Sequence, residues 1–390
     1  MTDSFHSTII IGGGIGGLAA ALSIANAGRA VCVLEQAPEF KEVGAGLQLA
    51  PNALRILDKL GALEYVKAKA FHPNRMIFLD ALTGKELKVV DLGSEFQARY
   101  GYPYIVTHRA DMLEALLRKC QENKLITLNT NVRVNSFSHR ENGGVELQTN
   151  VGTFSCEILI GADGLHSVVR KAFYDDPMIC HKYVAYRGTL PASAIEKHEY
   201  FNDVVCWIGP DLHLVQYPIR NSELYNQVAV FKSKNYSPEN DAWGGADELE
   251  TTFSNCFGAV KKSVSYMDTS RRWSLFDREP LTEWKKGNVV LLGDAAHPML
   301  QFLAQGACQA LEDADKLGFT LAVHASDIDL ALNTYVNCRI GKATKVQQGA
   351  RVFGSILHAQ DPTTILLRNT LFNEVDTNNY TFTDWLYQSE

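Results

Sequence analysis

The chain has 390 residues, of which 46% are hydrophobic and 21% charged, a composition typical of a globular protein with a sizeable core. Its formal net charge of −7 argues against nucleic acid or an anionic membrane as the main partner. The eight cysteines include no closely spaced pair, and the apolar run near the start is short and rich in glycine. We therefore expect a cytoplasmic enzyme with no metal site, no secretory signal and no integral membrane segment.

The first 35 residues predict a strand, a helix and a second strand. Residues 8–11 are a continuous β-branched run, which favours a central parallel strand buried on both faces. A glycine-rich turn follows at 12–17, then a helix of small residues at 18–28 and a strand at 30–35. This order is typical of the opening of a doubly wound sheet.

In the middle of the chain the predicted elements change from a mixture of helices and strands to mainly strands. Helices are predicted at 52–59 and 109–123, and strands at 126–128, 144–149 and 157–160. From about residue 183 to 267 there is little predicted helix; alternating strands are expected at 183–190, 204–208, 212–219 and 225–231. This pattern indicates an antiparallel sheet with one solvated face. A buried strand returns at 288–292, and residues 306–372 are mostly helical.

The predicted fold class is therefore α/β, with a Rossmann-like nucleotide-binding domain interrupted by an antiparallel β-rich substrate domain and followed by a helical C-terminus. The predicted nucleotide-binding domain consists of residues 1–74, 100–178 and 285–360. The predicted substrate domain consists of residues 75–99 and 179–284, and residues 361–390 form a C-terminal helical segment. In that segment the apolar side chains are expected to pack on the core, rather than to cap a pocket or form an interface: Leu366, Leu367, Phe372, Trp385 and Tyr387.

The glycine-rich turn predicts a dinucleotide site. Gly12, Gly14 and Gly17 supply the tight turn, the close approach of a pyrophosphate and the packing of helix on strand. The free N–H groups of the helix N-terminus then face the phosphate charge. Glu35, at the end of the second strand, can accept hydrogen bonds from a ribose diol and would repel a 2′-phosphate. FAD and NAD both remain open at this point.

Two later turns favour FAD. Asp163 lies in Gly161-Ala-Asp-Gly164 and Asp294 lies in Gly293-Asp-Ala-Ala-His-Pro298, and each turn follows a buried strand. Open α/β sheets bind ligands at these carboxyl ends. A simple NAD dehydrogenase needs no third site of this kind, whereas FAD has a long ribityl chain to hold.

With these motifs in this order, the sequence resembles the single-component FAD-dependent aromatic hydroxylases over about residues 7 to 350. The resemblance implies that Glu35 binds the adenosine ribose, that Arg109 binds FAD, and that Asp163 serves both FAD and a nicotinamide donor. It also implies that Asp294 binds the ribityl or pyrophosphate part and that Pro298 lies near the flavin ring. Gly306 and Ala307 would open a helix whose dipole stabilises reduced flavin.

Four further stretches resemble the 3-hydroxybenzoate branch of this family: 183–188, 213–218, 297–306 and 385–387. This resemblance implies that the protein uses O2 and NADH, with NADPH as the alternative, to convert 3-hydroxybenzoate to 2,5-dihydroxybenzoate (gentisate). It also makes a homodimer plausible. Other substrates remain open, namely salicylate, 4-hydroxybenzoate, 6-hydroxynicotinate or a quinolone. A non-catalytic dinucleotide-binding protein is the alternative from a different class.

Hydroxylation by an electrophilic oxygen requires an electron-rich ring, so a phenol reacts best as its proton leaves. His213 and Tyr217 lie four residues apart on a predicted strand and share one face of it. We expect His213 to accept the phenol proton, directly or through a water, and Tyr217 to orient the substrate. Gln301 would hydrogen-bond a substrate hydroxyl or carboxylate. Two arginines are candidates to bind a substrate carboxylate, Arg187 and Arg220.

Overall fold

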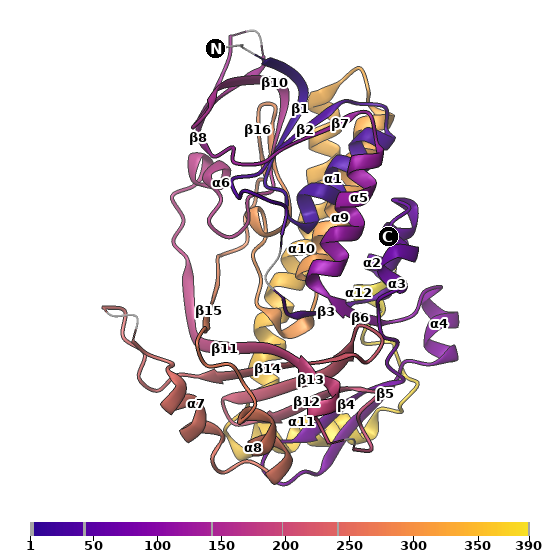
Figure 1. Cartoon of the computed structure of the whole chain (residues 1–390), viewed down its shortest axis with the longest axis vertical. Coiled ribbons are helices and arrows are strands. Elements are labelled where there is room, and N and C mark those ends of the chain that lie inside the picture. Colours follow the sequence, from indigo (N-terminus) through magenta and orange to yellow (C-terminus); the bar gives the residue numbers. More distant parts are fainter. Residues whose placement is uncertain (1–3, 42–43, 142, 197, 240–241, 389–390) are drawn as a thin grey trace.

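The computed structural model describes residues 4–41, 44–141, 143–196, 198–239 and 242–388. Figure 1 shows two sheets at opposite ends of the long axis, with the long helix α10 (Ile328–Leu357) running between them. Within the described ranges, no helix combines the length and apolar composition that a membrane crossing requires. The fold is mixed α/β with a helical C-terminal part.

The first sheet contains the strand-turn-helix unit predicted at the start. Its strand order is β16-β17-β10-β1-β2-β7, and all neighbours from β17 to β7 run parallel. The bounds are β1 (Ser4–Ile11), β2 (Val31–Leu34), β7 (Ile126–Asn129), β10 (Gly152–Gly161), β16 (Lys285–Lys286) and β17 (Val289–Leu291). The strands β8 (Val134–His139) and β9 (Val145–Thr149) extend the sheet beside β10. Its buried β-branched residues place β1 in the middle of the sheet.

Three helices pack together along this sheet: α1 (Ile15–Asn26), α5 (Arg109–Glu122) and α9 (Gly306–Val323). The small residues of α1 allow a close approach to α9, since a Cβ at Gly318 would lie only 2.2 Å from Ser23 Oγ. This packing fixes the N-terminal ends of α1 and α9 beside the ends of the parallel strands. Shorter helices complete this half: α2 (Pro51–Lys59), α3 (Leu63–Lys67), α4 (Ser94–Tyr100) and α6 (Val168–Phe173).

The second sheet has the order β15-β11-β14-β13-β12-β4-β5. Neighbouring strands are antiparallel except β4 and β12, which run parallel. The bounds are β4 (Arg75–Asp80), β5 (Glu86–Asp91), β11 (Ile179–Pro191), β12 (Val204–Gly209), β13 (Leu212–Ile219), β14 (Leu224–Lys232) and β15 (Trp273–Asp277). Residues from β4 and β5 thus join a sheet whose other strands lie far along the chain. The exact domain boundaries stay a prediction.

We expected this sheet to have one solvated face and little helix around it, and both expectations are wrong. The helices α7 (Ala246–Phe253) and α8 (Gly258–Val264) cover one face, where Phe253 joins a buried apolar cluster. On the other face Ala350 of α10 and Ala185 of β11 belong to one buried apolar cluster. Every residue of β12 is therefore buried.

The C-terminal segment returns along the second sheet through α11 (Pro362–Glu374) and ends in α12 (Asp384–Tyr387), which packs beside α2. Phe372 packs on Phe78 of β4, as core packing predicts. Trp385 and Tyr387 also pack on the core, as predicted, and both in addition line the large cavity described below. Leu366 and Leu367 remain 66% and 58% exposed, so core packing does not hold for them. The homodimer stays a prediction.

Candidate active site

A cavity of about 1060 Å³ extends from the glycine turn of the first sheet to the inner face of the second. The first end is lined by the three turns that follow β1, β10 and β17. The second end is lined by side chains of β11 to β14 and by residues 299–307. Residues of the C-terminal segment close one side. The volume exceeds what a small aromatic ligand alone would need, which points to a large cofactor together with a substrate.

The glycine turn has the shape that a phosphate-binding turn requires. Gly12 has φ +103°, and a Cβ there would lie 2.4 Å from the Ala162 carbonyl oxygen. A Cβ at Gly17 would lie 2.0 Å from the Gly12 carbonyl oxygen, whereas one at Gly14 would meet no protein atom within 4 Å. The two flanking glycines therefore hold the turn against its neighbours, and Gly14 leaves open space toward the cavity.

Glu35 lies beside this turn at the end of β2. Its carboxylate accepts hydrogen bonds from the Gly13 N–H at 2.7 Å and from the Ala37 N–H at 2.8 Å. These bonds fix the carboxylate at the cavity wall, where it lies among the lining residues. A carboxylate has further lone pairs, so it can still accept bonds from a ribose diol.

Asp163 also lines the cavity, and it organises the start of α6. It accepts hydrogen bonds from Ser167 Oγ at 2.5 Å and from the Val168 N–H at 2.7 Å. Burial raises the pKa of this carboxyl group, although these hydrogen bonds oppose the rise. Asp163 is thus a local capping residue at the cavity edge, and its expected contact with cofactor and donor stays a proposal.

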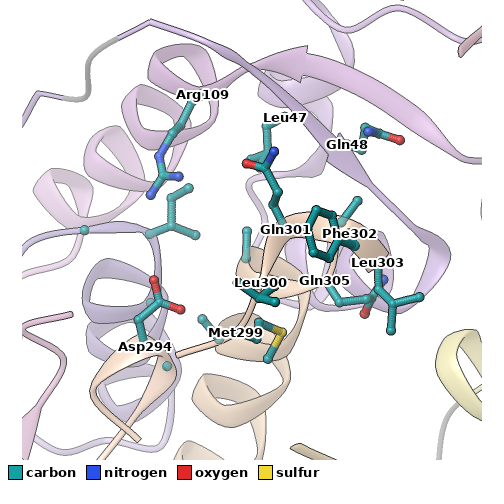
Figure 2. A pocket seen from close by; sticks show the side chains of 18 of the residues that line it. Leu47, Gln48, Arg109, Asp294, Met299, Leu300, Gln301, Phe302, Leu303 and Gln305 are labelled. Atoms are coloured by element: carbon teal, nitrogen blue, oxygen red, sulfur yellow. The ribbon is translucent and has the colours of Figure 1, made fainter. Parts of the chain in front are cut away.

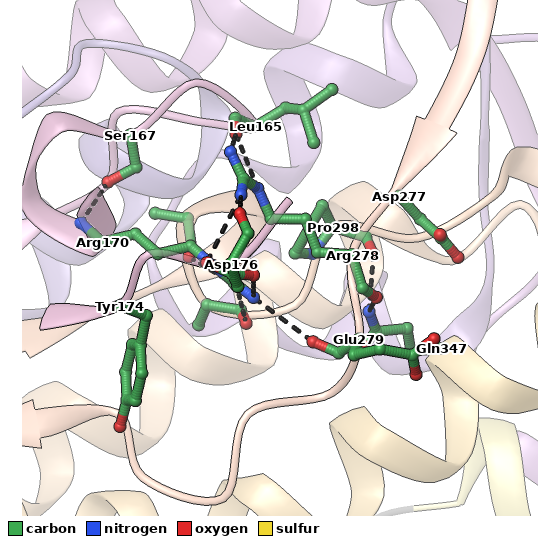
Figure 3. A network of polar contacts seen from close by, with 12 residues as sticks. Leu165, Ser167, Arg170, Tyr174, Asp176, Asp277, Arg278, Glu279, Pro298 and Gln347 are labelled. Atoms are coloured by element: carbon green, nitrogen blue, oxygen red, sulfur yellow. Dashed lines mark hydrogen bonds and ion pairs between the residues drawn. The ribbon is translucent and has the colours of Figure 1, made fainter. Parts of the chain in front are cut away.

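Arg170 joins the second turn to the third (Figure 3). Its side chain is 1% exposed, pairs with Asp176 at 2.7 Å, and donates to the carbonyl oxygens of Ala295 and Ala296 at 3.1 and 2.8 Å. Arg278 adds bonds to the Leu165 carbonyl at 3.4 Å. The two aspartate turns are therefore fixed relative to each other by a buried cation.

The third turn and the helix behind it supply the polar groups of the cavity floor. Figure 2 shows Asp294 and Arg109 pointing toward the same space from opposite sides. Arg109 is placed by the short ladder of β3 (Gly46–Leu49) and β6 (Ile105–His108), since its N–H donates to the Ala45 carbonyl at 3.0 Å. Gly306 and Ala307 line the cavity at the first turn of α9. The N–H groups of that turn have no partners within the helix.

His297 and Pro298 lie behind the cavity. The His297 side chain contacts Asp313 at 2.5 Å, and His297 is 1% exposed, which agrees with a structural role. Burial alone would raise the pKa of Asp313, but His297 and Arg339 lower it to about 2. Pro298 is buried and bonded through its carbonyl to Gln347 at 2.9 Å, and the next residue, Met299, lines the cavity instead. Its expected position beside the flavin ring stays untested.

At the second sheet, His213, Val215 and Tyr217 all line the cavity from β13. Strand pairing places Val215 opposite Val228 of β14, and Val228 opposite Arg187 of β11. Arg187 and Val215 are therefore in one row across three strands, with Cα atoms roughly 10 Å apart. This face thus presents a histidine, a tyrosine and an arginine to one space.

Arg187 has an unusual environment for a cation. It lines the cavity, its Nε is buried without a hydrogen-bond partner, and it forms no ion pair with a carboxylate in the described part of the chain. Its Nη2 donates a short hydrogen bond to Gln301 Oε1. Burial and the neighbouring Arg109 lower the pKa of Arg187. A buried guanidinium without a counter-charge is costly, and an anionic ligand would relieve that cost.

His213 has a partner that the sequence did not reveal. Its Nδ1 lies 2.6 Å from Nε2 of His358, at the end of α10, and each residue is 3% exposed. Burial lowers the pKa of His213 to about 3. Nothing in the sequence around His358 marks it, because the contact joins residues 145 positions apart.

Arg220 does not lie in the cavity, so it is not the carboxylate ligand. It pairs with Asp111 at 2.8 and 2.9 Å, and its side chain is 37% exposed. The cavity is also lined by residues that were not predicted, among them Gln48, Tyr104 and Phe302. Tyr104 donates to Gln48 Oε1 at 2.8 Å. Such residues carry no motif, and only folding brings them to the cavity.

Known proteins resemble this chain over most of its length. The family described as FAD binding domain matches residues 6–350. A 3-hydroxybenzoate 6-hydroxylase of Polaromonas naphthalenivorans is 37% identical over 97% of this chain and 95% of its own. A 3-amino-4-hydroxybenzoate 2-monooxygenase of Streptomyces cremeus is 31% identical over 93% and 90%. The crystal structure of Klebsiella pneumoniae HpxO with FAD and uric acid has a TM-score of 0.86 at 23% identity, covering 98% and 97% of the two chains.

The chain therefore belongs to the FAD-binding family of aromatic monooxygenases. FAD is its cofactor, and the residues present fit that molecule. Open space above Gly14 could admit a pyrophosphate, the Glu35 carboxylate is fixed at the cavity wall, and the cavity continues past Asp294 to the second sheet. A reduced nicotinamide is the typical electron donor of such enzymes.

Proposed function

We propose that the protein hydroxylates 3-hydroxybenzoate to 2,5-dihydroxybenzoate. The overall reaction consumes the substrate, O2, NADH and a proton, and gives the dihydroxy acid, NAD⁺ and water. One oxygen atom enters the ring and the other leaves as water, with both electrons from NADH. NADPH is the alternative donor.

One observation carries this proposal: a half-buried guanidinium, with no carboxylate partner among the described residues, shares a sheet face with a histidine and a tyrosine. Arg187 provides the positive charge that a ring carboxylate requires, and a charge-assisted bond of this kind is stronger than a neutral one. His213 lies two residues before Val215 on the same strand and on the same face, where it can contact a phenolic oxygen. A phenolic aromatic acid has a group for each of them, a carboxylate for Arg187 and a phenolic oxygen for His213. The relative from Polaromonas, named 3-hydroxybenzoate 6-hydroxylase, supports the particular acid.

The residues then have distinct roles in the proposed reaction. Arg187 binds the carboxylate, and Gln301 holds the guanidinium through its side-chain oxygen. Tyr217 orients the ring, and His213 bonds the phenolic oxygen. Bound FAD, once reduced, supplies the activation of O2. The buried side chains around the cavity exclude water and so protect the reaction from loss of the activated oxygen.

Related acids are the main alternatives. The Streptomyces relative is named for 3-amino-4-hydroxybenzoate, which also carries a carboxylate and a phenolic hydroxyl. Salicylate, 4-hydroxybenzoate and 6-hydroxynicotinate differ from 3-hydroxybenzoate in the angle that the hydroxyl and carboxylate substituents make on the ring. The distance between Arg187 and His213 would select among them, because both groups sit on one rigid sheet.

A substrate panel tests the proposal. FAD-loaded protein with NADH and O2 is expected to consume NADH faster with 3-hydroxybenzoate than with the other acids, and to form 2,5-dihydroxybenzoate. Oxygen uptake and chromatography of products measure this, and a parallel series with NADPH identifies the donor. If another acid gives the only hydroxylated product, the substrate assignment is wrong.

Replacing Arg187 with Met is expected to raise KM for 3-hydroxybenzoate by about 10- to 100-fold, because a hydrogen bond to a charged group is lost. The neutral analogue 3-hydroxybenzyl alcohol should bind the wild type weakly and should be little affected by the substitution. Arg220→Met is the matched control, since that arginine pairs with Asp111 outside the cavity. An equal KM for the acid in wild type and Arg187→Met would remove Arg187 from substrate binding.

A further inference from the structure

The contact between His213 and His358 restricts which ring nitrogens of the two residues carry protons. Its N···N distance of 2.6 Å requires a hydrogen bond, so one ring contributes an N–H and the other a lone pair. Burial lowers the pKa of both rings, to about 3 for His213 and about 2 for His358. Both rings are therefore neutral, and each carries one proton.

Two arrangements of these protons are possible. If His213 donates from Nδ1, the proton of His358 lies on its own Nδ1. If His358 donates from Nε2, its Nδ1 is a bare lone pair, and the proton of His213 lies on Nε2. Which arrangement forms depends on what surrounds His358 Nδ1.

His358 Nδ1 is buried and meets no hydrogen-bond partner among the described residues. The ring is enclosed by Tyr183, Phe302 and His213, at centroid distances of 4.8, 5.1 and 4.9 Å. A buried N–H without an acceptor is among the rarest arrangements in proteins, and an unused acceptor is less rare. The second arrangement is therefore favoured.

We propose that His358 is a positioning residue that fixes the tautomer of His213, so that His213 presents an N–H to the substrate oxygen. His213 lines the cavity and uses Nδ1 for His358, so Nε2 is the ring nitrogen left for a ligand. An N–H donor there stabilises an ionised phenol, whose proton has passed to solvent on binding. This replaces the sequence-based expectation that His213 accepts the phenol proton, and it rests on the proposed function only for the identity of the ligand.

The surroundings of the pair contain few charges that could reverse this arrangement. The titratable or charged groups that the described contacts place nearest to it include Tyr183, Arg187, Asp211, Tyr217, Lys232 and Arg368. Lys232 lies over the Tyr183 ring at 5.9 Å and within 3.8 Å of Asp211. Arg368 donates to the Leu357 carbonyl at 3.2 Å rather than to either imidazole.

Nuclear magnetic resonance of the FAD-loaded protein with ¹⁵N-labelled histidine tests the tautomer without any substrate. At neutral pH, His213 is expected to show a protonated Nε2 and an unprotonated Nδ1, and His358 the same. A protonated Nδ1 on His213 would overturn the proposal. Because no ligand is added, this result is independent of the proposed substrate.

Two variants separate hydrogen bonding from packing. His358→Phe keeps a ring against Tyr183 and Phe302 but removes the donor, and His358→Gln keeps a donor near the Nε2 position but loses the ring. In His358→Phe, the absorbance titration of bound 3-hydroxybenzoate is expected to show a phenol pKa about one to two units higher than in the wild type. More NADH should then yield hydrogen peroxide instead of product.

His358→Gln should restore the wild-type phenol pKa at least in part. If His358→Phe matches the wild type in the phenol pKa and in the yield of hydrogen peroxide, His358 acts by packing alone and the proposal fails. The same holds if His358→Phe keeps the wild-type values and His358→Gln does not. FAD content and melting temperature of each variant show whether it is folded. If the wild type binds no hydroxybenzoate at all, the proposed function fails, whereas the magnetic resonance result still decides the tautomer.

Discussion

Gly14→Ala is expected to leave the apoprotein folded but to weaken FAD binding by about 100-fold, because a methyl group would occupy the space that a pyrophosphate needs. A Cβ at this position meets no protein atom within 4 Å, so the folded chain itself tolerates it. The loss should appear as a colourless purified protein, a higher Kd in fluorescence titration with FAD, and an unchanged melting temperature of the apoprotein.

Gly17→Ala is the informative comparison within the same turn. Its Cβ would lie 2.0 Å from the Gly12 carbonyl oxygen, so it should lower the melting temperature of the apoprotein as well. Gly341→Ala, at an exposed position of α10 with open space around it, is the control for adding a methyl group elsewhere. Wild-type FAD affinity in Gly14→Ala would mean that the pyrophosphate does not approach this turn.

His213→Ala is expected to reduce formation of 2,5-dihydroxybenzoate by at least about 100-fold while FAD stays bound. The substitution removes the group proposed to bond the phenolic oxygen, and it lies on the second sheet, away from the glycine turn. NADH oxidation should continue in part and yield hydrogen peroxide. Chromatography of the product and a peroxide assay on the same sample measure this partition.

His139→Ala is the matched control, because that histidine is exposed on β8 and does not line the cavity. His213→Gln, which keeps a polar group near the same place, should recover part of the product yield. Unchanged product formation in His213→Ala would remove His213 from the mechanism.

The FAD-binding half was predictable because its signals are local. A β-branched run followed by glycines at fixed spacing determines both the strand and the turn, and Asp163 and Asp294 each follow a buried strand within three residues. His213 and Tyr217 were placed together by the two-residue period of a strand, and both line the cavity. In each case a few residues close together in the chain are enough to predict the structure.

What could not be predicted depends on contacts between distant segments. The helices α7 and α8 have 8 and 7 residues, and their burial against the second sheet, not their own pattern, makes them part of the core. Arg187 and Arg220 look alike in sequence, and only the fold pairs Arg220 with Asp111 and leaves Arg187 with no carboxylate partner in the described part of the chain. His358 belongs to the same class, because its partner His213 lies on a strand of the second sheet, 145 positions away in the chain.

The strand order of the first sheet has a consequence for folding. Ile11 pairs with Gly161, and Gly161 pairs with Leu291, so the three strand ends that surround the cofactor come from widely separated parts of the chain. Such non-local pairing is slow, and the apolar strands are exposed to aggregation until it is complete. We therefore expect FAD to find a complete site only after β17 has joined the sheet, so that retention of FAD by the refolding protein marks the end of assembly rather than its beginning.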